Sequence, residues 1–575
     1  MKKKKKIKQK SFFFEDYEES EINNNKKNLS TIKVSLNRIT FLFFVFLSII
    51  IIFSTKIIYL SLAPEKKIFL EKNKQTFVNN RADITDRNGL ILARNINIYR
   101  AKIRPKFLKD KEKFLINIRI KFPELDYKEI KNKLNKEKFF YIGSRRLTEK
   151  EKDKLWSLGL GNKVLDLEKK QYRVYPQKNL FSHVLGQTDE DNMGISGIEK
   201  FFDRDLSNKK LSNFSLVLSL DSNLQHLIRE ELIKSQTIFN TIGSAGLLMD
   251  VSSGEILSLV SLPDYDLNKR LSITKDIYTN KVTKGVYELG SVFKTFTLAA
   301  GIENNIIDPG TIFKNLESKI FCAGREISEH DRLPKNLTAE QILIRSSNIG
   351  AIRMAQKIGL EKYKNFLNSL ELFQKIDFDL EEVGSPLSFT WGKCKLATAS
   401  FGHGVTTTLL QLARAYAILG NGGNKIQPTL LKKNITFKKK TKKIISSETS
   451  VKINSILRKV VANKEGTANF ADIKGYEVGG KTGTALKSIN GIYSNKKINT
   501  FVSLFPTSKP KYVLLVMLDE PQAAPGYVYE FSNGYKHKGE QRNTSGWNTV
   551  VVAGKIIEKI GPILAINNLQ ASKKF

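Results

Sequence analysis

Three short motifs in this chain carry side chains that suit acyl transfer through a serine hydroxyl. They are Ser-Val-Phe-Lys at residues 291–294, Ser-Ser-Asn at residues 346–348 and Lys-Thr-Gly-Thr at residues 481–484. A serine hydroxyl becomes a strong nucleophile when a neighbouring base takes its proton. On a helix, side chains three residues apart share one face, with Cβ atoms roughly 5–6 Å apart. The spacing therefore predicts Ser291 as a nucleophile and Lys294 as its base.

Lys294 can act as a base only if it loses its own proton near neutral pH. A lysine pKa near 10.4 must then fall by about three units, which costs on the order of 4 kcal/mol. Burial and a second nearby cation lower a lysine pKa in this way, and Lys481 is the candidate cation. We expect Lys294 and Lys481 to lie within contact distance of Ser291. Ser346 and Asn348 would complete the site as a proton relay and an amide that orients the substrate.

The Lys481 motif is expected on a strand to which a peptide can bind. Side chains alternate along a strand, so Thr482 and Thr484 share one face. Gly483 lets another backbone approach closely. An extended peptide can pair with such a strand, and Lys481 with the two threonine hydroxyls would then bind its C-terminal carboxylate.

Isolated copies of these motifs are common in a chain rich in Lys and Ser. Residues 272–275 and 508–511 also read Ser-x-x-Lys, and residues 488–490 read Ser-x-Asn. What distinguishes the three chosen motifs is their order, spacing and context. Ser291 follows Gly290 at the start of a predicted helix, where free backbone N–H groups favour developing negative charge.

The motifs need strands and helices to bring them together, and apolar patterning predicts these elements. Strands are expected at residues 216–220, 245–251, 255–261, 500–505 and 512–518, and a further strand after the turn at residues 86–89. Helices are expected at residues 223–235, 338–344 and 550–560. Strands followed by helices and again by strands favour a mixed sheet with helices packed on it.

An uncharged run of Phe, Ile and Leu at residues 39–55 predicts one membrane-spanning helix. The lysine-rich segment before it places the N-terminus in the cytoplasm by the positive-inside rule, so the rest of the chain is exported. A cleaved signal peptide is the alternative, because residues 61–63 resemble a cleavage site. The long N-terminal segment and the length of the apolar run favour an anchor.

Composition excludes several other classes of function. At 575 residues, two or more domains are expected. The net charge of +38 is spread along the chain as Lys, with no recognisable nucleic-acid module, so no nucleic-acid partner is expected.

The two cysteines, Cys322 and Cys394, are too few for a metal cluster. Two buried free thiols are the simpler interpretation, and pairing in an oxidising compartment stays open. His403 lacks the context of a triad and is interpreted as structural. We expect no metal and no cofactor.

Longer segments around the motifs resemble the class B penicillin-binding proteins. In the C-terminal part they are residues 287–294, 345–350, 402–407, 465–467 and 480–485; upstream they are residues 81–89, 173–176 and 194–199. The segments at residues 501–521 and 545–563 are most similar to the septal, cell-division branch. Leu289, Ala82 and Thr408 depart from the family, which often has Pro, Gly and Pro at these positions.

The resemblance implies a mixed α/β fold. It consists of a penicillin-binding transpeptidase domain, with an antiparallel sheet flanked by helices, on an elongated α+β pedestal behind one N-terminal transmembrane helix. The domains implied are a cytoplasmic basic tail (residues 1–38), an anchor (39–62), a pedestal like the dimerisation domain of the family (64–212), a transpeptidase domain (213–565) and a C-terminal tail (566–575).

The resemblance also implies a peptidoglycan D,D-transpeptidase of septal wall synthesis in the bacterial inner membrane, with a periplasmic catalytic domain. Ser291 would attack the penultimate D-Ala of a stem pentapeptide, and an amine from a second stem would resolve the acyl-enzyme. Backbone N–H groups of Ser291 and Thr484 would form the oxyanion hole, and Thr482, Gly483 and Thr484 would bind substrate. β-Lactams would acylate Ser291.

The partners implied are lipid-linked precursor or nascent glycan carrying stem pentapeptides, a glycosyltransferase of the SEDS type and other division proteins of the membrane. Three alternatives stay open. They are a class B transpeptidase of elongation, a D,D-carboxypeptidase that hydrolyses the same acyl-enzyme, and a non-catalytic division scaffold or β-lactam sensor.

Overall fold

The computed structural model describes residues 27–62, 70–72, 81–142, 147–208, 214–269, 277–433, 441–489, 491–530 and 534–572. The chain divides into two compact units, Met1–Ile68 and Phe69–Phe575. Most of the predicted basic tail, the predicted boundary at residues 212 and 213, the second Ser-x-x-Lys at residues 272–275 and the last three residues lie outside the described residues.

The first unit contains one long helix, α1 (Lys27–Leu62). Its segment Arg38–Ile58 is 21 residues of high mean hydropathy with exposed side chains. At 1.5 Å per residue this segment is about 31 Å long, the thickness of a bilayer core. The hydroxyls of Ser48 and Thr55 donate to carbonyl groups one turn earlier, which satisfies them inside the helix. The predicted apolar helix is confirmed, and it begins earlier than the apolar run.

The N-terminal part of the second unit is built on a mixed sheet with the order β1-β6-β2-β3-β4, in which β5 also pairs with β3. The strands are β1 (Leu70–Lys72), β2 (Asp83–Thr85), β3 (Ile91–Ile103), β4 (Phe140–Tyr141), β5 (Leu165–Val174) and β6 (Phe214–Val217). The turn before β3 is formed by Asp86, whose side chain accepts from the backbone N–H groups of Asn88 and Leu90. The predicted turn and following strand are confirmed.

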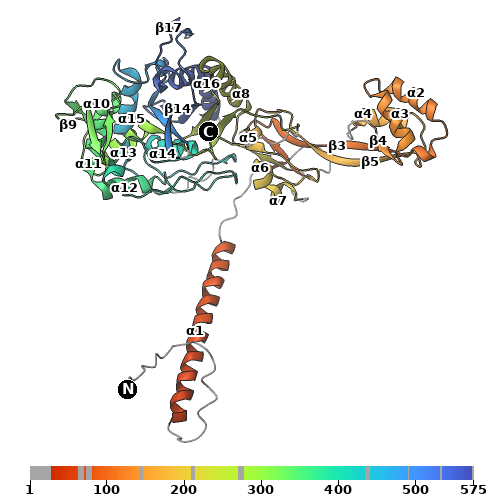
Figure 1. Cartoon of the computed structure of the whole chain (residues 1–575), viewed down its shortest axis with the longest axis horizontal. Helices are drawn as coiled ribbons and strands as arrows, with labels where there is room; N and C mark the ends of the chain where they lie inside the picture. The colour runs from red at the N-terminus through yellow and green to blue at the C-terminus, as the bar shows by residue number, and fades with distance from the viewer. Residues whose placement is uncertain are drawn as a thin grey trace, which may run out of the picture. The chain divides into compact units, whose positions relative to one another are not determined.

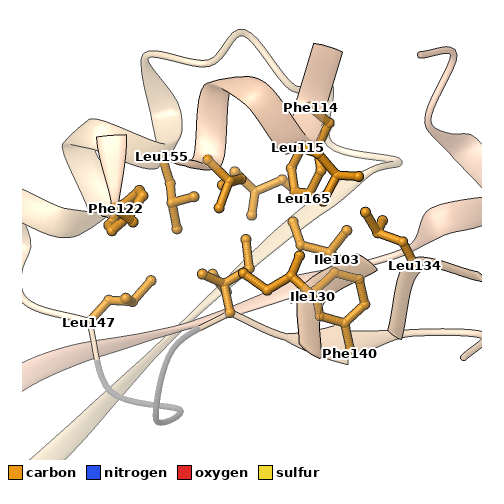
Figure 2. Close-up of a cluster of buried hydrophobic side chains, with 13 residues drawn as sticks. Ile103, Phe114, Leu115, Phe122, Ile130, Leu134, Phe140, Leu147, Leu155 and Leu165 are labelled. Atoms are coloured by element: carbon orange, nitrogen blue, oxygen red, sulfur yellow. The ribbon is translucent and has the colours of Figure 1, made fainter. Parts of the chain in front are cut away.

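A separate apolar cluster lies where one end of the β3–β5 ladder meets α2 (Lys111–Lys121), α3 (Tyr127–Lys136) and α4 (Glu149–Trp156) (Figure 1). Asp110, Asp126 and Thr148 cap the N-termini of these helices with their side chains, which fixes where each helix begins. Figure 2 shows that side chains from all three helices and the paired strands meet in this cluster, including Phe114, Ile130, Leu155 and Leu165. The pedestal region therefore has a small hydrophobic core of its own.

A buried ion-pair network holds the other end of this region. Glu199 accepts from Arg81 Nε and from Arg173 Nε, each at 2.7 Å, and Arg81 also pairs with Asp203 at 2.7 Å. Arg81, Arg173 and Glu199 are almost fully buried. Removing one partner of such a network leaves a buried charge without compensation.

The C-terminal part contains a five-stranded antiparallel sheet with the order β13-β14-β15-β7-β8. Its strands are β7 (Gly243–Asp250), β8 (Ile256–Leu262), β13 (Gly479–Ile489), β14 (Ile492–Phe505) and β15 (Tyr512–Asp519). All residues of β8 and β15 are buried, so helices cover both faces of the sheet. The predicted hairpin is confirmed as β7 and β8, and the last two predicted strands are confirmed within β14 and β15.

Two groups of helices pack on this sheet (Figure 1). The first contains α8 (Ser222–Phe239) and α16 (Thr549–Ser572); the second contains α14 (Leu409–Gly420) and α15 (Ser447–Ala462). The predicted helices at residues 223–235 and 550–560 are confirmed. The predicted domain boundaries stay predictions. Immediately after the boundary predicted at residue 213, β6 pairs with β1 and β2 of the N-terminal sheet. At the other boundary, α16 continues past residue 565.

The other short helices and strands lie along the pedestal region and around the five-stranded sheet. They are α5 (Ser182–Leu185), α6 (Gly197–Phe201), α7 (Asp203–Leu206), β9 (Ile312–Phe313), β10 (Lys319–Cys322), β11 (Arg325–Ser328), β12 (Leu337–Thr338), α10 (Ala339–Ile344), α11 (Asn348–Ile358), α12 (Leu360–Ser369), α13 (Lys393–Ala399), β16 (Val528–Glu530) and β17 (Lys536–Lys538).

A disulfide joins two of these elements. Cys322 at the end of β10 is bonded to Cys394 in α13, with Cα atoms 5.7 Å apart. The interpretation of both cysteines as free thiols is therefore wrong. The alternative, in which the two cysteines form a disulfide, is confirmed. Spacing along the chain could not show this, because the fold alone brings the β10–β11 hairpin beside α13.

Candidate active site

Ser291 lies in a tight 3₁₀ turn, η3 (Gly290–Phe293), that runs directly into α9 (Lys294–Glu303). The predicted helix start is confirmed, with one 3₁₀ turn before the α-helical part. Ser291 is partly exposed, whereas Lys294 is completely buried. The nucleophile candidate therefore faces the surface at the beginning of a helix, and its proposed base lies in the interior.

Two glycines let this turn lie directly against β13. A Cβ atom on Gly290, which has a φ of 60°, would lie 2.7 Å from the carbonyl oxygen of Thr484. A Cβ atom on Gly483 would lie 2.3 Å from the carbonyl oxygen of Leu289. Both distances are too short for any side chain, so the first and third motifs meet backbone to backbone. The close backbone approach that was predicted at Gly483 is therefore confirmed, and its partner is Leu289.

Lys294 is held by the second motif. Its Nζ donates to the carbonyl oxygen of Ser346 at 2.5 Å and to Oδ1 of Asn348 at 2.7 Å, and it lies 3.3 Å from Oγ of Ser346. Ser346 joins α10 to α11 in the left-handed region, with a φ of 59°. Such a conformation costs energy in a residue other than glycine and is often found at functional sites.

Lys481 reaches the same hydroxyl from β13. Its Nζ lies 2.8 Å from Oγ of Ser346, 3.2 Å from the carbonyl oxygen of Thr482 and 3.3 Å from Oγ1 of Thr482. Lys481 is completely buried. The hydroxyl of Ser346 therefore lies between two buried amines that come from α9 and from β13.

The other members of the third motif are fixed by neighbouring loops. Oγ1 of Thr482 is hydrogen-bonded to Oγ1 of Thr467 at 2.9 Å, and Oγ1 of Thr484 accepts from the backbone N–H of Ser545 at 3.1 Å. Gly483 contributes backbone alone. The predicted site residues thus lie on η3, α9, the turn before α11, the first residue of α11 and β13.

Burial sets the protonation of the two lysines. Removal from water lowers the pKa of Lys294 to about 7, although the negative charge of Glu329 acts in the opposite direction. Burial, together with the charge of Lys294, lowers the pKa of Lys481 well below its ordinary value. Two ammonium groups that share the hydroxyl of Ser346 in an interior repel each other, which disfavours the state in which both amines are protonated.

Sequence motifs missed one charged residue of this region, Glu329. Its Oε1 accepts from Oγ of Ser347 at 2.5 Å and from the backbone N–H of Ile349 at 3.0 Å, and its Oε2 accepts from the backbone N–H of Asn348 at 2.8 Å. It lies outside all three motifs, in a segment rich in charged residues, and no spacing rule marks it.

His403 is partly exposed, and its interpretation as structural stays a prediction. Its ring stacks on Phe401 and on Tyr493, and Nδ1 lies 3.5 Å from Oε2 of Glu288. The same carboxylate accepts from the backbone N–H of Gly404. Among the described residues, no group of three or more His, Cys, Asp and Glu side chains could hold a metal ion.

Two family models match this chain. The penicillin binding protein transpeptidase domain matches residues 244–537, and the penicillin-binding protein dimerisation domain matches residues 77–237. The chain is 30% identical over 498 residues to a protein of Caulobacter vibrioides named probable peptidoglycan D,D-transpeptidase FtsI, covering 84% of this chain and 82% of that protein. It is 29% identical to the peptidoglycan D,D-transpeptidase FtsI of Buchnera aphidicola subsp. Baizongia pistaciae, covering 88% of this chain and 95% of that protein.

A solved structure matches the C-terminal part. The transpeptidase domain of penicillin-binding protein 3 from Burkholderia pseudomallei, in its apo form, aligns with a TM-score of 0.52 and 26% sequence identity. The alignment covers 60% of this chain and 96% of that domain.

Proposed function

Because the chain belongs to the class B penicillin-binding proteins and is most like FtsI, we propose that Ser291, Lys294 and Lys481 carry out its acyl transfer. The chain is a peptidoglycan D,D-transpeptidase of the serine type, and its family is the target of β-lactams. The observation that carries the assignment of roles is the hydroxyl of Ser346, which lies between two buried amines. A proton can pass along such a chain of hydrogen bonds.

Each amine has three oxygen partners, so the hydrogen bonds alone do not assign the base. Lys294 contacts the Ser346 carbonyl, Asn348 Oδ1 and Ser346 Oγ, and Lys481 contacts Ser346 Oγ and two oxygens of Thr482. Burial lowers the pKa of both amines. We assign Lys294 as the base because it follows Ser291 by one helical turn, and Lys481 as the amine that faces the substrate carboxylate.

In the first half-reaction, Ser291 Oγ attacks the carbonyl carbon of the penultimate D-Ala and Lys294 takes its proton. The negative charge that develops on the carbonyl oxygen is stabilised by backbone N–H groups of Ser291 and Thr484. The C–N bond then breaks, and the leaving amine of D-Ala receives a proton through Ser346. An amine of a second stem attacks the ester, loses its proton by the same route and releases Ser291.

Substrate binding is assigned to β13, an edge strand of the five-stranded sheet. A stem peptide that runs along this edge pairs with backbone groups of the strand. Its terminal carboxylate then lies against Lys481, Thr482 and Thr484, while Gly483 keeps the strand close to the nucleophile turn.

The helix α1 anchors the chain to a membrane. We assign the N-terminus to the cytoplasm and the domains at residues 64–212 and 213–565 to the periplasm, in the bacterial inner membrane. Two observations support this orientation: the lysine-rich segment before α1, and the disulfide between Cys322 and Cys394, which suits an oxidising compartment. A SEDS-type glycosyltransferase and other division proteins are the proposed partners in septal wall synthesis.

Product analysis tests this function. The full-length protein in detergent is incubated with a stem pentapeptide and an acceptor peptide that carries a free amine. We expect release of D-Ala together with a cross-linked dimer, and neither product from Ser291→Ala. Release of D-Ala without a dimer would identify a carboxypeptidase, and no product at all would favour a non-catalytic scaffold.

A further inference from the structure

The β10–β11 hairpin borders the candidate active site but belongs to none of its motifs. Two attachments hold it. At its tip, Cys322 is bonded to Cys394 of α13, and at its base Glu329 binds the first turn of α11. Between them, β10 and β11 pair in register from Lys319 with Ser328 to Cys322 with Arg325. The hairpin is therefore fixed at both ends against helices that surround the site.

Glu329 fills the N-terminus of α11 with a carboxylate. Its two oxygens accept three hydrogen bonds, from the Ser347 hydroxyl and from the backbone N–H groups of Asn348 and Ile349. Ser347 is also the N-cap of the helix, because its Oγ accepts from the backbone N–H of Gly350 at 2.8 Å. A carboxylate at this end of a helix is favoured by the helix dipole and by the free N–H groups.

The same segment fixes the orientation of the Asn348 amide. Nδ2 of Asn348 donates to the carbonyl oxygen of Ser328 at 2.9 Å, so the amide oxygen must point the other way. That oxygen accepts from Nζ of Lys294 at 2.7 Å. Ser328 and Glu329 therefore set both the backbone and the side chain of a residue that holds the proposed base.

The charge of Glu329 also acts on the base. The charged and titratable groups that face Lys294 are Lys481 from β13, and Glu329 and His330 from the segment after β11. Among these, Glu329 is the carboxylate that opposes the effect of burial on Lys294. Its loss would favour the neutral amine while loosening the contacts that aim this amine.

We propose that Glu329 is a positioning residue for acylation, acting through Ser347 and Asn348 on Lys294. The proposal rests on the proposed roles of Ser291 and Lys294, since it describes how their geometry is maintained. The left-handed backbone of Ser346 lies directly before Ser347, so the anchor of Glu329 also stabilises the turn that carries the proton relay.

The test compares rate constants of penicillin acylation across pH for full-length Glu329→Gln, Glu329→Asp and wild type, with a fluorescent penicillin as the probe. We expect Glu329→Gln to slow acylation roughly 10- to 100-fold, the size of effect that a small misplacement of reacting groups produces. We also expect its loss of rate at acid pH to begin at lower pH, because the removed charge favoured the ammonium form of Lys294. Glu329→Asp keeps the charge but not the reach, so its rate should fall without a shift in the pH profile.

The chain offers a matched control in Glu303, at the other end of α9 from Lys294. The carboxylate of Glu303 accepts from the backbone N–H and hydroxyl of Ser446 and from the hydroxyl of Thr449, at the N-terminus of α15. Glu303→Gln should lose comparable stability and keep both the rate constant and the pH profile. A rate constant does not depend on the folded fraction, so a merely structural role of Glu329 would leave it unchanged.

The proposal is overturned if Glu329→Gln acylates at the wild-type rate with the wild-type pH profile, or if Glu303→Gln changes both to the same extent. Failure of the proposed function itself would be seen separately, as a penicillin adduct that persists on Ser291→Ala.

Discussion

The protonation of Lys294 makes acylation sensitive to acid. Burial lowers the pKa of this amine to about 7 from an ordinary value of 10.5. A base must be deprotonated, so the active fraction is lost as pH falls through this pKa. From pH 7 to pH 5 the neutral fraction of such a group falls roughly 50-fold, and from pH 7 to pH 9 it rises only about twofold. The rate constant of acylation should follow these fractions.

The assay is the second-order rate constant for labelling by a fluorescent penicillin, measured from pH 5 to pH 9 on the full-length protein. Lys294→Ala should be slower by three orders of magnitude or more, roughly the combined loss of base and orientation. Lys511→Ala is the control, because this exposed lysine belongs to an unrelated Ser-x-x-Lys and should keep the wild-type profile. A rate constant that stays flat down to pH 5, or that falls already below pH 10, would refute the assignment of a neutral Lys294.

Two further variants test the scaffold through the free energy of unfolding in urea. Replacing Cys322 and Cys394 together by Ser should lower it by about 4 kcal/mol, because the disulfide closes a long loop with a sequence separation of 72; equal midpoints for the variant and the oxidised wild type would contradict this. Glu199→Ala should cost roughly 3–5 kcal/mol, since it leaves the buried Arg173 without its carboxylate and Arg81 with Asp203 alone. Its control, Glu381→Ala, breaks an exposed pair and should leave the denaturation midpoint close to that of wild type; a similar loss in both variants would be inconsistent with a buried network.

Apolar patterning was sufficient to predict the central sheet, for a physical reason. β7, β8 and β15 are buried on both faces, so their sequences are continuous apolar runs that few other elements share. The amphipathic pattern of α8 was equally clear. The long β3–β5 ladder was harder to predict, because many of its residues are only partly buried and its sequence alternates weakly.

The motifs mark their candidate residues because the chemistry they suggest is local. Ser291 and Lys294 are three residues apart, and the turn at Ser346 and the strand at Lys481 have recognisable sequences. Glu329 and the partner of Cys322 were not predictable in this way. Their roles depend on contacts between segments far apart in the chain, which no spacing along one segment encodes.

The structure also explains how the departures from the family pattern are accommodated. Leu289 is buried, and its carbonyl oxygen lies against Gly483 of β13. The contact with β13 therefore holds the backbone of Leu289 in place without a proline. Thr408 replaces the other common proline and caps α14, with its hydroxyl accepting from the backbone N–H of Gln411 at 3.2 Å. Ala82 is buried beside the ion-pair network, where its carbonyl oxygen accepts from Arg173 at 2.9 Å.

The most direct test of the nucleophile is mass analysis of the intact protein after labelling with a fluorescent penicillin, followed by peptide mapping. Wild type should gain the mass of one penicillin, on the peptide that contains Ser291, and Ser291→Ala should gain none while keeping the wild-type denaturation midpoint. An adduct of the same mass on Ser291→Ala, or one mapped to another serine of the parent protein, would contradict the assignment of Ser291.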